Sequence, residues 1–174
     1  MKAEYINPFL KSVTRIIEET TSEKPVMGKV FLRDSYPYTT EEVAIFVGIT
    51  GFLSGQLVIS LPHQCACEIA AMMLMEEKVY ELDEFAQSAI AEMGNMITAN
   101  ATIGLAEAGY DCNITPPSVI TGKKMEISSP SKIRTVVIPL TLGGSKIEVN
   151  LSLIETAALV TDSKVVEFAP KTNR

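Results

Sequence analysis

The sequence has little of what nucleic-acid-binding and membrane-spanning proteins need. Acidic residues outnumber basic residues by 21 to 15, and no cluster of Lys or Arg is longer than Lys123 and Lys124, so the clustered positive charge that holds a phosphate backbone is missing. The longest apolar run, residues 69–75, is far too short to span a bilayer, and the N-terminus lacks the apolar core of a signal peptide. We therefore expect a cytoplasmic protein with no nucleic-acid partner and no membrane insertion.

Cysteine and histidine are also scarce. The three cysteines, Cys65, Cys67 and Cys112, fit reduced thiols better than a disulfide framework. The single histidine, His63, shares a helix face with Cys67, but Cys65 points almost oppositely and no fourth zinc ligand is evident. No Ser-His-Asp set is suggested, and no Walker-type or Gly-x-Gly-x-x-Gly loop occurs. We expect no metal site and no cofactor of the protein's own.

Three segments show helical patterns. Apolar residues at helical spacing predict a first helix over residues 7–21, with Asn7 as its N-cap and Pro8 at its first helical position. A Glu-x-x-Asn pair also occurs at Glu4 and Asn7, but we expect Asn7 to have a structural role there because it is the predicted N-cap. The other two helices are predicted at residues 62–76 and 82–108.

β-Branched and aromatic runs predict an antiparallel sheet. The predicted strands are residues 28–33, 42–50, 55–61, 133–142 and 146–154. Gly143 and Gly144 signal a hairpin turn, and Pro116 and Pro117 place residues 113–122 at an edge or interrupt any strand there. Residues 165–168 could add a strand. With 174 residues and 47% apolar content, we expect a single α+β domain whose long helices cover one face of the sheet.

The long helix carries a polar seam, which is Ser88, Glu92 and Asn95. At about 100° per residue these three side chains fall within an arc of roughly 60°. The residues predicted to share that face are Glu84, Ala91, Ala99, Thr102 and Ala106. Those predicted to face a core are Phe85, Ala89, Ile90, Met93, Met96, Ile97, Ala101 and Leu105, with the Asn100 amide buried among them.

Two interpretations of the polar seam are open. A carboxylate and an amide can simply solvate the exposed face of an amphipathic helix, which is the usual case. The small alanines around Glu92 and Asn95 instead favour a contact surface, because they let another protein approach closely.

The polar seam also carries a family resemblance. Ser88-x-x-x-Glu92-x-x-Asn95 on a long helix, followed about twenty residues later by Pro116 and Pro117, resembles the signature of the CheC/CheX/FliY phosphatases. Residues 55–62, leading into 69–73, are similar to the strand and helix before that signature helix in CheX-type members. A single signature helix matches the CheX branch. The resemblance implies a CheC-like fold over residues 1–154, with residues 155–174 as a C-terminal extension.

The resemblance implies a phosphatase of a phosphorylated CheY-like receiver in chemotaxis. Asn95 would orient the attacking water and Glu92 would pair with a receiver lysine, while Ser88, Ala91 and Ala99 would contact the partner. Mg²⁺ would be supplied by the receiver. The family also implies a homodimer, for which the late Val- and Ile-rich strands offer an edge. Two alternatives remain open: an adaptor that binds a receiver without hydrolysis, and a structural dimerisation module.

Overall fold

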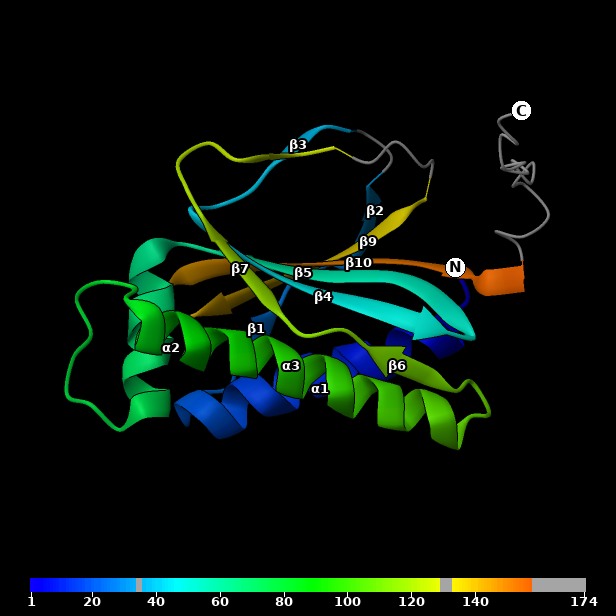
Figure 1. Cartoon of the computed structure of the whole chain (residues 1–174), viewed down its shortest axis with the longest axis horizontal. Coiled ribbons are helices and arrows are strands. Elements are labelled where there is room, and N and C mark those ends of the chain that lie inside the picture. Colours follow the sequence, from blue (N-terminus) through cyan, green and yellow to red (C-terminus); the bar gives the residue numbers. More distant parts are fainter. Residues whose placement is uncertain (34–35, 129–132, 158–174) are drawn as a thin grey trace, which may run out of the picture.

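An antiparallel sheet forms the centre of the molecule in the computed structural model, which describes residues 1–33, 36–128 and 133–157. The strands follow the order β1-β9-β10-β5-β4-β6, with β2 also paired to β9 and β7 to β4 (Figure 1). Its long strands are β4 (Val43–Gly51), β5 (Leu53–Leu61), β9 (Thr135–Leu142) and β10 (Ser145–Glu155). Its short strands are β1 (Val26–Met27), β2 (Phe31–Arg33), β6 (Cys112–Ile114) and β7 (Ser118–Thr121).

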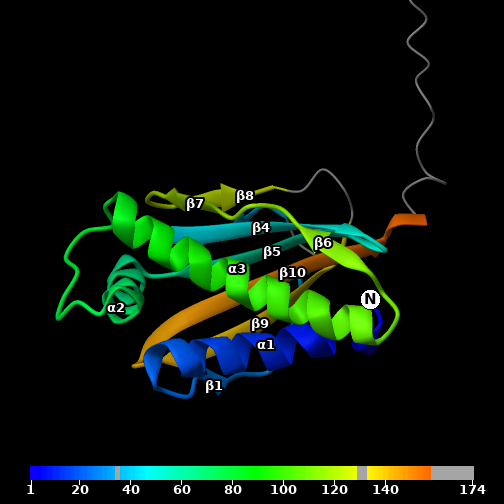
Figure 2. The ribbon, with the colours of Figure 1, turned by 60° about the horizontal axis from the view of Figure 1, so that its bottom comes forward.

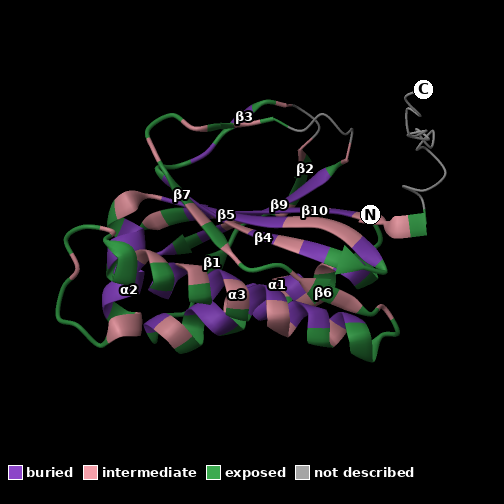
Figure 3. Cartoon of the chain, in the orientation of Figure 1, coloured by how far each residue is buried: buried purple, intermediate pink, exposed green. Residues whose placement is uncertain are grey.

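All three described helices lie on one face of this sheet (Figure 2). They are α1 (Ala3–Thr21), α2 (His63–Leu74) and α3 (Glu84–Glu107). Figure 3 shows the buried residues concentrated between these helices and the sheet. Ile90, Met93 and Ile97 of α3 are fully buried there against strand residues such as Ile45 and Leu57. The predicted α+β class, with helices covering one face of an antiparallel sheet, is confirmed.

The opposite face of the sheet carries a separate two-stranded pair, β3 (Tyr38–Thr39) with β8 (Glu126–Ile127). The Arg33 guanidinium lies 2.7 Å from the Glu148 carboxylate and 4.1 Å from the centre of the Tyr38 ring. Burial raises the pKa of Tyr38 to about 12. These contacts attach the β3–β8 pair to the sheet.

The element order repeats once along the chain. A helix followed by five strands, α1 to β5, is matched by α3 to β10. The pairings are reciprocal, since β1 and β2 pair with β9 while β6 and β7 pair with β4, and the equivalent strands β5 and β10 pair with each other. This arrangement sets α1 beside α3, and the buried Ser12 hydroxyl of α1 donates to the Ile97 carbonyl of α3 at 2.6 Å.

The first helix begins earlier than the sequence predicts. Its N-cap is Lys2, so Asn7 and Pro8 lie inside α1 and the prediction of Asn7 as a cap is wrong. The cause is packing: Tyr5 and Phe9, four residues apart, are both buried. That burial holds a further helical turn despite the backbone hydrogen bond that Pro8 cannot donate.

The hairpin predicted at Gly143 and Gly144 is confirmed, and β4 and β5 form a second antiparallel pair. β9 pairs with β10 through Gly143 and Gly144, whose φ values of +55° and +83° suit a tight two-residue turn. Pro116 and Pro117 separate β6 from β7, and both strands pair with β4 at the sheet edge. Residues 165–168 lie outside the described residues.

The late strands do not supply the free sheet edge that the sequence predicts. β10 is central, and β9 is covered along its outer side by β1 and β2. The edge on the β9 side of the sheet is therefore the segment 26–33, whose Val26, Phe31 and Leu32 side chains are exposed. The prediction of a free edge at the late strands is wrong because a high Val and Ile content indicates that a strand is buried, but it does not indicate where the strand lies within the sheet.

The end of β10 is tied to the start of α1. The Tyr5 hydroxyl donates to Glu155 Oε1 at 2.7 Å, and Lys2 Nζ lies 3.1 Å from the same oxygen. The Thr156 hydroxyl donates to the Gly51 carbonyl. The division of the chain between residues 154 and 155 stays a prediction, but Glu155 and Thr156 both bond to the folded part.

Acid should weaken this tie. Hydrogen bonds from Tyr5 and then Lys2 lower the pKa of Glu155 below its ordinary value of 4.5, so its contribution to stability is present above that pH and is lost as the pH falls. We expect Glu155→Gln to lower the melting temperature at pH 7, and the difference from the native chain to shrink below pH 4.5. Thermal unfolding of both proteins between pH 3 and pH 7 measures this, and a difference that persists at pH 3 would contradict it.

Candidate active site

The polar seam lies on α3 as the sequence predicts. Glu92 and Ser88 are exposed and Asn95 is half-buried. The Asn95 amide donates from Nδ2 to Glu92 Oε2 at 3.3 Å, and the Ser88 hydroxyl donates to the Glu84 carbonyl one turn earlier at 2.8 Å. The three side chains therefore share one face, and the carboxamide and carboxylate are already in contact.

Local signals place the helix that carries them. The Asp83 carboxylate caps its start by accepting from the Ala86 N–H at 2.9 Å. Within the helix, Gly94 lies directly before Asn95 and is buried against β4. A Cβ at position 94 would stand 2.7 Å from Ile45 Cγ2. The absence of a side chain at Gly94 thus lets α3 approach the sheet closely, and it sets how deep Asn95 sits.

This close approach predicts the effect of Gly94→Ala. Ile45 is fully buried, so the added methyl must push helix and strand apart at a cost of about 1–3 kcal/mol, offset by the roughly 1 kcal/mol that alanine gains over glycine in a helix. We expect the free energy of unfolding to fall by about 0–2 kcal/mol. Urea denaturation measures it, with Gly104→Ala as the control because the atom nearest to a Cβ there is Pro8 Cβ at 3.2 Å, which is farther than the 2.7 Å found at Gly94. A larger loss in Gly104→Ala would contradict this account of Gly94.

Only some of the neighbours of the polar seam lie where the sequence predicts. Ala91 and Ala99 are half-buried beside it, and Ala106 is exposed. Thr102, predicted on the same face, is buried, and its hydroxyl donates to the Ala99 carbonyl. Asn100, predicted to be buried in the core, is half-buried and lines a hollow between α1 and α3.

The structure corrects the predicted positions of two apolar side chains. Phe85 is 74% exposed and Met96 is 36% exposed, so neither faces the core. Both lie on the face of α3 that carries Glu92, as does Ile103, which is 59% exposed. Their spacing could have revealed this, because residues 85, 92 and 99, and likewise 96 and 103, are seven apart and nearly eclipse along a helix.

The proline pair lies close to this helix. Pro116 and Pro117 stand between β6 and β7, and both strands contact α3. The segment is anchored to β4, since the Thr115 N–H donates to the Gly48 carbonyl and the Gly48 N–H donates back to the Thr115 hydroxyl. The Pro116–Pro117 segment is thus held between two strands that both contact α3.

Two comparisons decide the family. The family model described as chemotaxis phosphatase CheX matches residues 43–141. The protein named CheY-P phosphatase CheX of Thermotoga maritima is 31% identical over 135 residues, which are 74% of this chain and 83% of that protein. The chain belongs to the CheX family.

Solved structures similar to this CheX-family chain include three of note. The CheC-like superfamily protein from Shewanella sp. PV-4 has a TM-score of 0.79 and 25% identity, over 88% of this chain and 99% of that one. Chemotaxis protein CheX from Desulfovibrio desulfuricans has a TM-score of 0.78 and 26% identity, over 87% and 99%. The CheX-CheY-BeF3-Mg+2 complex from Borrelia burgdorferi has a TM-score of 0.74 and 28% identity, over 87% and 98%.

A second Glu-x-x-Asn pair of this CheX-family chain stands on α1. Glu4 and Asn7 are both exposed on the helix, so the predicted N-cap role does not explain Asn7. Their surroundings differ from those of the polar seam. The Glu4 carboxylate lies 3.7 Å from Lys2 Nζ, and the hollow that both residues line also holds Lys11 and Arg15. Only the pair on α3 stands among small and apolar neighbours.

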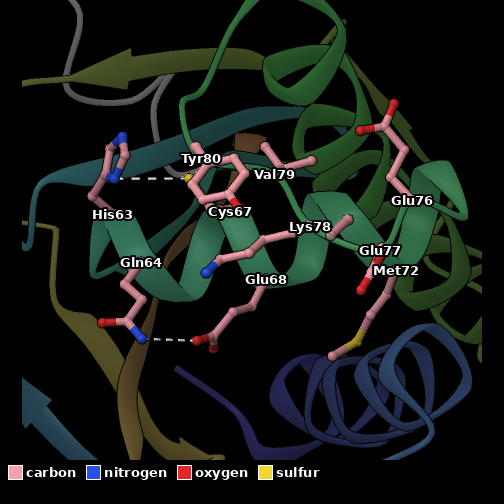
Figure 4. A pocket seen from close by; sticks show the side chains of 11 residues that line it. His63, Gln64, Cys67, Glu68, Met72, Glu76, Glu77, Lys78, Val79 and Tyr80 are labelled. Atoms are coloured by element: carbon pink, nitrogen blue, oxygen red, sulfur yellow. Dashed lines mark hydrogen bonds between the residues drawn. The ribbon is translucent and has the colours of Figure 1, made fainter.

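His63 and the nearby cysteines do not form a metal centre. His63 Nδ1 lies 3.7 Å from Cys67 Sγ at a hollow of about 400 Å³ between α2 and the segment after it (Figure 4). Burial is the main cause that raises the pKa of Cys67, and it raises that of Cys65 to about 11, so burial disfavours the thiolate form that binds a metal. Among the described residues, no group of three or more His, Cys, Asp or Glu side chains could hold a metal ion.

In residues 1–33, 36–128 and 133–157, no helix is both long and apolar enough to cross a membrane.

Proposed function

We propose that this CheX-family chain hydrolyses the acyl phosphate of a phosphorylated CheY-like receiver in chemotaxis signalling. The observation that carries the proposal is the contact between Asn95 and Glu92 on an exposed helix face bordered by Ala91 and Ala99. The similarity to a protein named CheY-P phosphatase supports the same substrate. A receiver substrate places the activity in the cytoplasm.

The reaction requires no covalent intermediate on the phosphatase. Phosphoryl transfer depends on positioning and on charge stabilisation. The water oxygen forms a bond to phosphorus, the bond from phosphorus to the aspartyl oxygen breaks, and inorganic phosphate and a free carboxylate leave. The complex solved for the Borrelia burgdorferi relative contains CheX, CheY, beryllofluoride and magnesium. We infer that the receiver brings Mg²⁺ and that this chain contributes no cofactor of its own.

Asn95 is the residue we assign to the water. One of its N–H groups donates to Glu92; its carbonyl oxygen and second N–H have no partner within the part of the chain that the structure describes. A carboxamide with one acceptor and one donor remaining can hold a water molecule by both its hydrogen and its oxygen. The contact with Glu92 fixes the orientation of the amide.

Glu92 and the small residues are assigned to docking. The Glu92 carboxylate has a second oxygen with which to accept from a receiver lysine, and this charge-assisted bond would fix the helix in register. Ser88 donates to the backbone and can still accept from the partner. Ala91 and Ala99 permit close approach.

The proposal is tested by following the decay of the acyl phosphate on a cognate receiver in Mg²⁺, with and without the native chain. We expect the chain to accelerate the decay, even after it has been treated with EDTA and dialysed. Binding to the receiver without acceleration would leave the adaptor hypothesis in place of the phosphatase. An activity lost on EDTA treatment and restored by a metal added to the chain alone would contradict the assignment of Mg²⁺ to the receiver.

We also propose that the chain forms a homodimer through the sheet edge at residues 26–33. Val26, Phe31 and Leu32 expose apolar side chains along this edge, and an exposed apolar edge is suited to pairing with a second copy. Light scattering after size-exclusion chromatography should give twice the mass of the chain, and Leu32→Lys should give the monomer mass. A monomer in the native chain would contradict the proposal.

A further inference from the structure

Three apolar side chains on α3 form an apolar ridge, which is Phe85, Met96 and Ile103. Their exposed fractions are 74%, 36% and 59%. Burying such side chains on association is favourable in proportion to the apolar area removed from water. Because these side chains are exposed in the single chain, a binding partner that covered them would gain this free energy.

The apolar ridge brackets the polar seam. Phe85 precedes Glu92 by seven residues, and Ile103 follows it by eleven, so the ridge extends about 27 Å along the helix at 1.5 Å per residue. The wheel positions of Phe85, Met96 and Ile103 all fall within about 40° of Glu92. A protein surface that reached Glu92 and Asn95 would meet the ridge on the same approach.

The neighbouring helix shows that this exposure is specific to α3. The exposed residues of α1 are mostly charged and include Lys11, Arg15, Glu18 and Glu19. Helix α3 contains neither Lys nor Arg, and Glu92 is its only charged residue between Glu84 and Glu107. Two helices on the same face of the same sheet thus present opposite surfaces, one suited to water and the other to a protein.

We propose that the apolar ridge is the surface by which this chain recognises the receiver, a step that rests on the proposed function. Its occupant is a folded receiver domain whose phosphorylated pocket is rimmed by apolar side chains. The ridge is continuous with the polar seam, so one rigid helix supplies the affinity through Phe85 and Ile103 and the reaction geometry through Asn95. An aromatic anchor surrounded by smaller contacts is typical of the residues that dominate interface energies.

Binding without turnover tests the ridge separately from the reaction. The receiver is activated with beryllofluoride and Mg²⁺, which give a stable mimic of the phosphorylated form, and is titrated with the full chain by calorimetry. We expect Phe85→Ala and Ile103→Ala each to raise Kd about 10-fold. In the turnover assay, each should raise KM by a similar factor and leave kcat within about twofold, because neither touches the reacting atoms.

Ile120→Ala is the matched control. Ile120 is 49% exposed, but it pairs with Ala44 in the β4–β7 register, whereas the next residue of β4, Ile45, faces α3. Its side chain therefore lies on the other face of the sheet. We expect its Kd to equal that of the native chain. A Kd that rises equally in Ile120→Ala would overturn the proposal, because it would report apolar surface in general.

The outcomes separate the two proposals. If the native chain binds the activated receiver through the ridge but does not hydrolyse the acyl phosphate, the phosphatase proposal fails and the ridge stands. If turnover occurs while Phe85→Ala and Ile103→Ala leave Kd unchanged, the ridge proposal fails alone. If the two variants leave Kd unchanged and convert a dimer into a monomer, the ridge covers a second copy of this chain and the receiver proposal is likewise overturned.

Discussion

Replacing Asn95 with alanine is expected to abolish the acceleration of receiver dephosphorylation while receiver binding persists. The substitution removes the carbonyl oxygen and the N–H assigned to the attacking water and leaves Glu92 and the apolar ridge in place. Loss of an oriented nucleophile costs on the order of 100-fold or more in rate. Phosphate release measured over a range of phosphatase concentrations should show a lower kcat, and calorimetry with the beryllofluoride-activated receiver should show a Kd within about threefold of native.

Asn100→Ala supplies the matched control for this prediction. Asn100 is the same residue type on the same helix, but it lines the hollow beside α1. We expect its kcat and Kd to equal the native values. An equal loss of kcat in both variants would show that the effect comes from changes in α3 as a whole. A loss confined to Kd in Asn95→Ala would make Asn95 a docking residue.

Glu92→Gln is expected to weaken receiver binding strongly. Glutamine keeps an oxygen that can accept from Asn95 Nδ2, so the orientation of the carboxamide is retained, but the negative charge assigned to a receiver lysine is lost. Removing one partner of a hydrogen-bonded charge pair in an interface costs roughly 2–5 kcal/mol, which corresponds to about a 30-fold or greater rise in Kd. Titration of the activated receiver at two salt concentrations measures this, and the deficit should shrink at high salt.

The control for this charge is Glu107→Gln, which neutralises the last residue of the same helix. Its Kd should change less than about twofold, since a rim charge contributes little to affinity. Comparison with Glu92→Ala separates the two roles of Glu92, because alanine also removes the contact to Asn95. A Glu92→Gln variant that binds as tightly as the native chain would contradict the docking role.

Most of the fold follows from local signals. The turn at Gly143 and Gly144 lies between two alternating β-branched runs, and two consecutive glycines suit the positive φ values found there. The long helix, predicted over residues 82–108, spans Glu84–Glu107 and so lies within one or two residues of its predicted bounds. Such features depend on a few neighbouring residues, so the sequence alone specifies them.

The departures arise where tertiary contacts decide. Asn7 resembles a helix cap, but burial of Tyr5 beside Tyr110, with ring centres 5.0 Å apart, extends α1 beyond it. Likewise, β9 is rich in buried residues whether or not it forms an edge, and only the pairing of β1 and β2 settles that it does not.

The polar seam was predictable and its surroundings were only partly so. Spacing alone places Ser88, Glu92 and Asn95 on one face. The same spacing places Phe85 and Met96 near Glu92, but their apolar character favours a core position, which the structure contradicts. Apolar character indicates that a side chain will be covered; it does not distinguish a core from a partner.

The most direct test of the account is the first-order rate constant for loss of the acyl phosphate from the receiver, measured in Mg²⁺ with saturating native chain and with saturating Asn95→Ala. Saturation removes any difference in affinity, so the ratio reports the reaction step alone. The account predicts that the native chain raises the rate constant well above that of the receiver by itself and that Asn95→Ala returns it to within a few-fold of that basal value. Equal rate constants for the two proteins would contradict it.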